Sequence, residues 1–262
     1  MKLVLLTFLA VAALAQKKDH TFGYDDTPMI PNQKWHVHDI NRPHPPLITP
    51  AVNGKAPSDA IVLFDGKDLS KWVTRVKGED TEPKWKIENG YFEVVPKTGS
   101  IVTKEKFGDV QLHLEWSEAA INEGVSQLRG NSGVIFQTRY EIQVLESHDN
   151  KTYADGQAGA IYGQHPPLVN ASLPPDQWQS YDILYEAPRF DADKKLVKPA
   201  YFTVIHNGVV VQNHAEVLGT TPHAKNGVYI AHGDDSLLLQ NHGSKVRFRN
   251  IWIRRLSPTD DR

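Results

Sequence analysis

The sequence has 262 residues, of which 40% are hydrophobic and 9% aromatic, a composition typical of globular proteins and sufficient for one large or two small domains. The formal net charge of -2 offers no electrostatic basis for binding nucleic acid or an anionic membrane. Because the sequence has no cysteine, we expect neither a disulfide bond nor a lipoprotein anchor.

Residues 1–15 have the features of a secretory signal peptide. Lys2 precedes an apolar run from Leu3 to Leu9, and the small residues Ala13 and Ala15 form an A-x-A cleavage pattern. The apolar run is too short to cross the ~30 Å hydrocarbon core of a bilayer, so we expect cleavage rather than membrane insertion. The sequence therefore predicts an exported bacterial protein, located in the periplasm or outside the cell.

Residues 16–58 are polar and proline-rich, and they show no sustained periodicity. This pattern predicts an extended arm that precedes the main domain, which we place at residues 59–258.

The main domain is predicted to be all-β. Short alternating runs recur between turn signals, including WKIENGYFEVV, DVQLHLEW, SYDILYE, AYFTVIHNGVVVQN, GVYIA and KVRFRNIWIRRL. The pairs Asn89-Gly90 and Asn207-Gly208 favour two-residue hairpin turns, because a type I′ turn needs positive φ at both positions. Many antiparallel strands without intervening helices predict a two-sheet sandwich or jelly roll.

One predicted strand, extending back from YEIQVLESH (140–148) to Gln137, carries a row of polar side chains. Gln137, Arg139, Glu141 and Gln143 share one face of this strand by alternation. A β-bulge at residues 144–145 would return Glu146 to the same face, with His148 next in line. Glu141 and Glu146 would then lie close enough to straddle one sugar ring, at the roughly 5 to 9 Å separation that glycosidases use.

Other segments add polar side chains that we expect near this strand. The loop at residues 149–163 contains Tyr162 and is of a kind that commonly builds ligand pockets. Gln240 and His242 are predicted to lie in a loop before the last strand, where Arg247 and Arg249 share a face. These arginines would bind oxyanions or carbonyls in a cleft, or pair with Glu141 and Glu146 across the sheet. Glu146, His148 and His242 form a candidate site for a divalent metal ion, although a lone histidine is more often structural.

Two resemblances suggest what such a site does. The E-x-Q-x-x-E stretch at residues 141–146 resembles the E-x-D-x-x-E strand of laminarinase- and lichenase-type glycoside hydrolases, with Gln143 in place of the middle aspartate. Over Leu63 to Leu256 the chain resembles the 3-keto-disaccharide hydrolase domain family. That resemblance rests on LFDGKDLSKW, GNSGVIFQTRYEIQVLES, AGAIYG, WQSYDILYEAP and LQNHGSKVRFRNIWIRRL.

The second resemblance implies a concanavalin-A-like jelly roll that cleaves glycosides already oxidised to a ketone at C3. The ketone acidifies the C2 proton, so a base can remove it and the enolate expels the C1 substituent. Glu146 or His148 would be the base or a metal ligand, and Arg139, Arg247 or a bound cation would polarise the ketone. Glu141 and Gln143 would bind sugar hydroxyls or complete the ion site, and Glu141 is also a candidate catalytic residue. The residues expected to contact substrate are Gln137, Arg139, Gln143, Tyr162, Gln240, Arg247 and Arg249.

Two other functions stay open from the sequence alone. Because jelly rolls also occur as lectins, a non-catalytic carbohydrate-binding module is one alternative. A retaining β-glucanase using Glu141 and Glu146 is the other. The partner predicted in every case is a small carbohydrate, and the sequence leaves the oligomeric state and the need for a metal undetermined.

Overall fold

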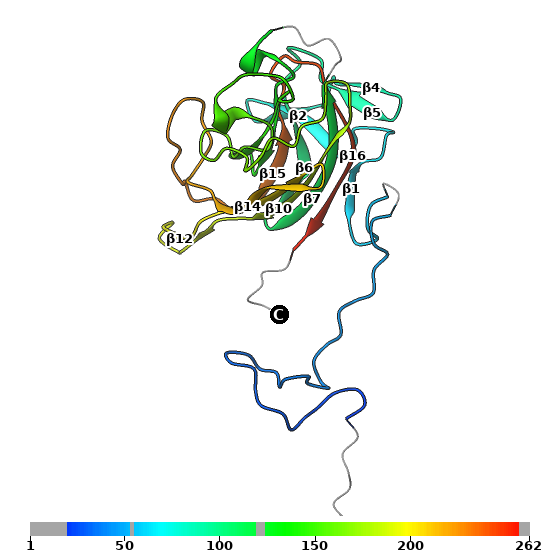
Figure 1. The fold of residues 1–262 in the computed structure, drawn as a ribbon, viewed down its shortest axis with the longest axis vertical. Helices are drawn as coiled ribbons and strands as arrows, with labels where there is room; N and C mark the ends of the chain where they lie inside the picture. Colours follow the sequence, from blue (N-terminus) through cyan, green and yellow to red (C-terminus); the bar gives the residue numbers. More distant parts are fainter. Residues whose placement is uncertain (1–19, 53–54, 119–123, 257–262) are drawn as a thin grey trace, which may run out of the picture. The chain divides into compact units, whose positions relative to one another are not determined.

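The computed structural model describes residues 20–52, 55–118 and 124–256 (Figure 1). The predicted signal peptide at residues 1–15 lies outside these ranges. In the part of the chain that is described, no helix has the length and apolar character needed to span a membrane. The chain divides into two units, Met1–Leu47 and Ile48–Arg262, so the boundary falls inside the predicted arm. In the first unit, isolated bridges pair Tyr24 with Asp39 and Met29 with His36.

The second unit is the predicted all-β sandwich of two antiparallel sheets, a concanavalin-A-like jelly roll. The larger sheet has the order β14 (Val209–Glu216), β13 (Tyr201–His206), β10 (Gln179–Glu186), β7 (Val110–Glu118), β16 (Val246–Arg255), β5 (Tyr91–Glu93) and β4 (Lys86–Glu88), and β1 (Ile61–Phe64) also pairs with β16.

The smaller sheet has the order β3 (Glu79–Thr81), β2 (Trp72–Val76), β6 (Ile101–Phe107), β15 (Asp235–Leu239), β8 (Ser132–Phe136) and β9 (Tyr140–Val144). A separate ribbon pairs β11 (Arg189–Phe190) with β12 (Leu196–Lys198). Two short 3-10 helices, η1 (Ser126–Leu128) and η2 (Ala154–Gly156), lie in loops of the described chain.

Both predicted hairpin turns are confirmed. Asn89 and Gly90 have φ of 48° and 80° and connect β4 to β5, and Asn207 and Gly208 have φ of 50° and 78° and connect β13 to β14. A third turn was not expected: Gln137 and Thr138, with φ of 50° and 57°, connect β8 to β9. The predicted continuous strand from Gln137 was therefore wrong, because the chain reverses there.

Two further sequence predictions differ from the structure, and some strands were not predicted. GVYIA at residues 227–231 forms no strand, and Tyr229 instead hydrogen-bonds Val217 O (2.6 Å) and Ala200 N (2.8 Å). β6 and β15 were not predicted, because charged residues interrupt the first and a continuous apolar run hides the alternation of the second. The predicted bulge at residues 144–145 is also absent from the strand pairing, which stays regular until β9 ends at Val144.

The core lies between the two sheets and fixes the position of β9. Tyr140, Ile142 and Val144 are fully buried there, so Glu141 and Gln143 lie on the outer face of the smaller sheet. Tyr181 of β10 donates a hydrogen bond across the core to Gln143 O (2.8 Å). A buried tyrosine hydroxyl needs such a partner, and the bond ties β9 to the opposite sheet.

Candidate active site

A small cavity opens on the outer face of the smaller sheet, beside β9. It has a volume of about 150 Å³, and we call it the inner cavity. Its lining residues share a polar character: Asn131, Glu141, Gln143, Tyr162, Thr221, His223, Gln240 and His242. Five of these eight residues, namely Glu141, Gln143, Tyr162, Gln240 and His242, were candidate site residues in the sequence. The structure thus brings together side chains from β9 and from four separate loops.

The free edge of β9 organises two of these loops. In the loop that follows β9, Gly159 N donates to Gln143 O (3.0 Å), and Tyr162 N donates to Glu141 O (3.1 Å). Farther along the same edge, Glu141 N donates to the Thr221 hydroxyl (3.1 Å), and Thr221 N donates to Arg139 O (3.1 Å). These backbone contacts place Tyr162 and the residues after Thr221 next to Glu141. In Figure 1 the two loops are the green segment after β9 and the orange segment before β15.

Glu141 is the carboxyl group of the inner cavity. Its side chain is buried, and burial raises its pKa to about 8. It leans over Gly133 of β8, where a Cβ atom would lie only 2.0 Å from Glu141 Oε1. With the nitrogen of the Gln143 amide turned toward β8, Gln143 donates to Ser132 O (2.9 Å) and to Glu141 Oε1 (3.3 Å). With this pKa the Glu141 carboxyl is mostly neutral near pH 7, and its ionised form is a poorly solvated and therefore stronger base. Such a group is suited to proton transfer.

The loop after β15 supplies neutral polar groups. Gln240 N donates to Gly133 O (3.0 Å), and Asn241 anchors the loop by donating from its side chain to Val95 O (2.8 Å). Gln240 Oε1 is buried and has no hydrogen-bond partner among the residues that the structure describes. An orphaned buried oxygen that lines a cavity is a group that a ligand can satisfy.

A second, wider cavity of about 460 Å³ adjoins the first, and we call it the outer cavity. It is lined by Tyr153, Asp155, Tyr162, Gly163, Pro222, His223, Ala224, Lys225 and Asn226. Tyr162 and His223 line both cavities and therefore mark their boundary. Tyr162 Oη lies 2.9 Å from His223 Nδ1 and 2.8 Å from Tyr153 Oη, so the three side chains form one hydrogen-bonded chain.

Glu146 does not line either cavity. Its side chain is fully buried, pairs with Arg129 Nη2 (2.5 Å), and accepts hydrogen bonds from His148 N (3.0 Å) and Asp149 N (3.3 Å). The chain leaves the sheet after Val144, so Glu146 turns away from the face of Glu141. The predicted straddling pair of Glu141 and Glu146 is therefore not formed.

A second buried carboxyl lies near Glu146. A Cβ atom on Gly130 would lie 2.8 Å from Glu118 Cβ and 3.2 Å from Glu146 Cβ, so this glycine separates the two side chains. Burial raises the pKa of Glu118 to about 8, and the charge of Glu146 acts in the same direction. The positive charge of Arg129 acts in the opposite direction on the pKa of Glu118, whereas Arg129 forms its ion pair with Glu146.

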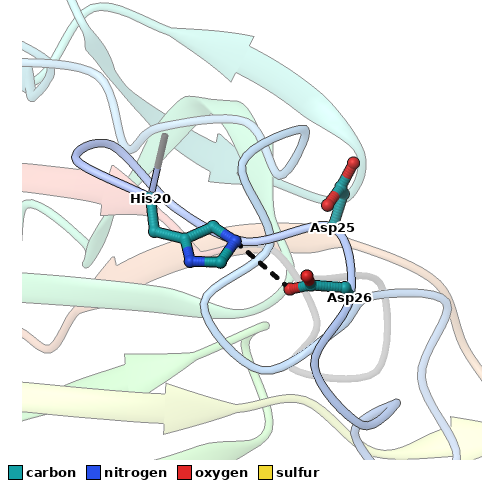
Figure 2. Close-up of side chains that lie close together, drawn as sticks. All are labelled: His20, Asp25 and Asp26. Carbon is teal, nitrogen blue, oxygen red and sulfur yellow. Dashed lines mark ion pairs between the residues drawn. The ribbon is translucent and has the colours of Figure 1, made fainter. Parts of the chain in front are cut away.

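The predicted metal ligands are not brought together. His148 is exposed and its Nδ1 lies 3.1 Å from Ser172 O, whereas His242 lines the inner cavity. Within the described ranges, one group of three side chains has metal-ligand atoms within 4.8 Å of one another, and it consists of His20, Asp25 and Asp26 in the first unit (Figure 2). His20 faces Asp26 at 3.4 Å, and exposed groups of this kind are common without an ion.

Gln137 and Arg139 also lie away from the inner cavity. Gln137 is buried in the turn after β8, where its amide accepts from Tyr185 Oη (2.8 Å) and donates to Phe107 O (3.0 Å). Arg139 pairs with Asp235 (2.8 Å). Both side chains hold the β8–β9 hairpin against its neighbours.

Arg247 and Arg249 lie on the other sheet. Because Val246 and Phe248 of β16 point into the core, the two arginines project from the outer face of the larger sheet. Arg247 pairs with Glu93 (3.0 Å), and Arg249 pairs with Glu115 (2.6 Å). Arg249 lines a separate cavity of about 430 Å³ together with Glu115 and Trp252, apart from the inner cavity. The predicted pairing of the two arginines with Glu141 and Glu146 is not formed.

Sequence reasoning missed Asn131, Thr221 and His223. Asn131 stands in the GNSGV segment, which was noted only as part of a family signature. Thr221 and His223 belong to TTPHAKNG, a polar segment without periodicity that gives no local signal of contact with β9.

Comparisons with known proteins agree with this architecture. A family model described as a 3-keto-alpha-glucoside-1,2-lyase-like domain matches residues 59–254. A solved structure of a proposed glycosyl hydrolase from Parabacteroides distasonis is 45% identical, with a TM-score of 0.78, covering 87% of this chain and 100% of that chain. A second proposed glycosyl hydrolase of that organism shows the same fold at 22% identity, with a TM-score of 0.56 and coverage of 76% and 94%. A comparison with curated proteins found no match.

Proposed function

The chain belongs to the 3-keto-alpha-glucoside-1,2-lyase-like domain family, and from this premise we propose that it cleaves glycosides whose sugar ring carries a ketone at C3. Its likeness to a proposed glycosyl hydrolase supports a glycoside-acting enzyme in general. The observation that carries the finer proposal is Glu141, a buried carboxyl with a pKa raised to about 8, in a cavity otherwise lined by amide, hydroxyl and imidazole side chains.

The proposed reaction is an elimination across C1 and C2. Glu141 in its ionised form removes the C2 proton, which the neighbouring ketone has acidified. The electron pair of the C2–H bond first forms the C2=C3 bond of an enolate, whose charge lies on the C3 oxygen. As the enolate returns to the ketone, the C1=C2 bond forms and the C1–O bond breaks, so the leaving group departs with that electron pair. Water then adds to the unsaturated ketone on this enzyme or on another. No nucleophilic carboxylate is needed, which is consistent with glutamine at position 143 and with Glu146 outside the cavity.

Hydrogen-bond donors in the same cavity would stabilise the enolate oxygen. His242 and the amides of Asn131 and Gln240 line the cavity with Glu141 and offer hydrogen-bond donors to the C3 oxygen. The lining contributed by the described residues includes no arginine or lysine, so Arg139 and Arg247 have no part in this proposal. The same cavity volume, about 150 Å³, suits a single ring better than a chain of sugars.

The alternatives account less well for this geometry. A retaining β-glucanase needs two carboxyls about 5 to 5.5 Å apart around the sugar, whereas Glu141 is the one carboxyl among the described residues that line the inner cavity. A lectin gains nothing from burying an ionisable carboxyl, because burial disfavours its charged form and costs stability.

The test compares a glucoside with its 3-keto derivative, in both anomers, and follows release of the C1 substituent. We expect turnover of the 3-keto compound alone, with Glu141→Gln reducing it by ~10³-fold or more. The matched control is Glu105→Gln, on the surface away from both cavities, which should keep the wild-type rate. Turnover of the unoxidised glucoside alone would overturn the proposal, and binding without turnover would favour a lectin. Repeating the assay after chelation tests whether a divalent ion takes part.

We also propose that the protein acts after export from the cytoplasm, on the basis of the signal pattern at residues 1–15. Mass spectrometry of the native protein tests this, because export with cleavage leaves Gln16 as the first residue, whereas an N-terminus at residue 1 contradicts it.

A further inference from the structure

The two adjoining cavities suggest how the substrate is divided between them. Glu141 lines the inner cavity and is absent from the outer one, whereas Tyr162 and His223 line both. If the C2 proton faces Glu141, the oxidised ring occupies the inner cavity. The bond from C1 to the leaving group then crosses the boundary, where Tyr162 and His223 stand.

We propose that the outer cavity binds the leaving group of the glycoside and that His223 protonates the leaving oxygen. This inference rests on the proposed function. The protonated imidazole donates from Nε2 to the glycosidic oxygen as the C1–O bond breaks, and the electron pair of that bond takes the proton. Glu141 gains one proton and His223 loses one, so the substrate yields an unsaturated ketone and a neutral alcohol.

The contacts of His223 hold its ring in a suitable orientation. Its Nδ1 lies 2.9 Å from Tyr162 Oη, and that hydroxyl lies 2.8 Å from Tyr153 Oη. The rings of Tyr162 and His223 are stacked with an angle of 25° between their planes. With Nδ1 engaged in this way, Nε2 is the nitrogen left for the substrate. His223 itself is exposed, so it can recover its proton from solvent after each turnover.

The lining of the outer cavity indicates the class of leaving group. Tyr153 is partly exposed, and its ring packs on Gly156, where a Cβ atom would lie 2.0 Å from the ring. An aromatic ring held in this way offers a surface for a sugar or an aryl group. Asp155, Lys225 and Asn226 add hydrogen-bonding groups. A second sugar or a polyhydroxylated aryl group fits this mixture better than an alkyl chain.

The test uses two 3-keto-glucosides that differ in how much their leaving groups need a proton. A sugar leaves as a strongly basic alkoxide, whereas 4-nitrophenol leaves readily as its anion. We expect His223→Ala to lower kcat/KM for the 3-keto-disaccharide by about 100-fold or more, with a change below about fivefold for the 4-nitrophenyl compound. The control His214→Ala alters a histidine on the larger sheet, stacked on Tyr201, and should leave both rates unchanged.

A second variant tests the binding role. Tyr153→Ala should raise KM for the 3-keto-disaccharide severalfold while leaving KM for 3-keto methyl glucoside unchanged, because the methyl group does not reach the outer cavity. Cleavage of neither compound by the wild-type protein would overturn both this inference and the proposed function. Wild-type cleavage combined with equal losses on both substrates in His223→Ala would overturn only the role of His223. An unchanged KM in Tyr153→Ala would overturn the assignment of the outer cavity.

Discussion

The carboxyl group of Glu141 occupies the space that a side chain at Gly133 would fill. The two residues lie on the same outer face of the β8–β9 hairpin, and a Cβ atom at position 133 would lie 2.0 Å from Glu141 Oε1 and 2.8 Å from its carboxyl carbon. The glycine therefore sets the position of the candidate base.

The first prediction concerns this contact. Gly133→Ala should force the Glu141 carboxyl to move and lower kcat on a 3-keto-glycoside by about tenfold or more, because proton transfer depends on placement within hydrogen-bond reach. Gly233→Ala is the matched control, since a Cβ atom there meets nothing within 4 Å. Steady-state kinetics compares kcat for the two variants, and circular dichroism checks that both are folded. Equal activity in both would contradict the role of Gly133 in positioning Glu141.

The second prediction is a pH profile. Because the Glu141 carboxyl must be ionised to act as a base and burial raises its pKa to about 8, kcat/KM should rise with pH and level off above about pH 8. A 4-nitrophenyl 3-keto-glucoside is the suitable substrate, since its leaving group needs no proton. A profile that is already flat from pH 5 would show that Glu141 is not the base.

The third prediction separates Glu146 from catalysis. Glu146→Gln leaves Arg129 without its buried partner and should lower the free energy of unfolding by about 3 kcal/mol, as breaking a buried ion pair does. Glu105→Gln breaks the surface pair with Arg255, in which both side chains are nearly half exposed, and should cost less than about 1 kcal/mol. Urea titration measures both changes. The folded Glu146→Gln protein should keep the wild-type kcat. A large decrease in kcat would show that Glu146 belongs to the active site.

The fourth prediction concerns Glu118, whose pKa burial raises to about 8. Between its unfolded pKa near 4.5 and this folded value, the folded state binds more protons than the unfolded state, so the free energy of unfolding falls as pH rises. Glu118→Gln removes this titration. Its stability relative to wild type should therefore improve from pH 5 to pH 8, with a slope of at most about 1.4 kcal/mol per pH unit. A difference independent of pH in denaturant titrations would contradict the raised pKa.

Local signals in the sequence predicted the fold well where the backbone demanded particular residues. Asn89-Gly90 and Asn207-Gly208 adopt positive φ with little strain, so their turns could be recognised. Gln137 and Thr138 adopt the same conformation against their usual preference, held in part by the Tyr185 hydrogen bond from the opposite sheet. That partner is 48 residues away along the chain, so no window around the turn reveals it.

The site was predictable to the extent that it follows strand alternation. Glu141 and Gln143 share the outer face of β9 as alternation requires, whereas Glu146 and His148 lie beyond the end of the strand, where alternation no longer applies. Arg247 and Arg249 share one face of β16, as alternation predicted. Alternation does not show which of the two sheets a strand belongs to, so it could not predict that these arginines lie on the larger sheet. His223 reaches the cavity through contacts of Thr221 with Arg139 and Glu141, about 80 residues earlier in the chain, which only the folded structure shows.

The loop that follows β9 has a consequence for engineering. β9 is the last strand of its sheet, and the loop residues Gly159, Ala160 and Tyr162 occupy backbone groups of Gln143 and Glu141 that would otherwise face solvent. A bare strand edge of this kind can pair with another chain and cause aggregation. Shortening the loop to admit a bulkier substrate would therefore also remove the protection of this edge, and variants with a wider opening need a substitute for it, such as a proline or a lysine on the exposed strand.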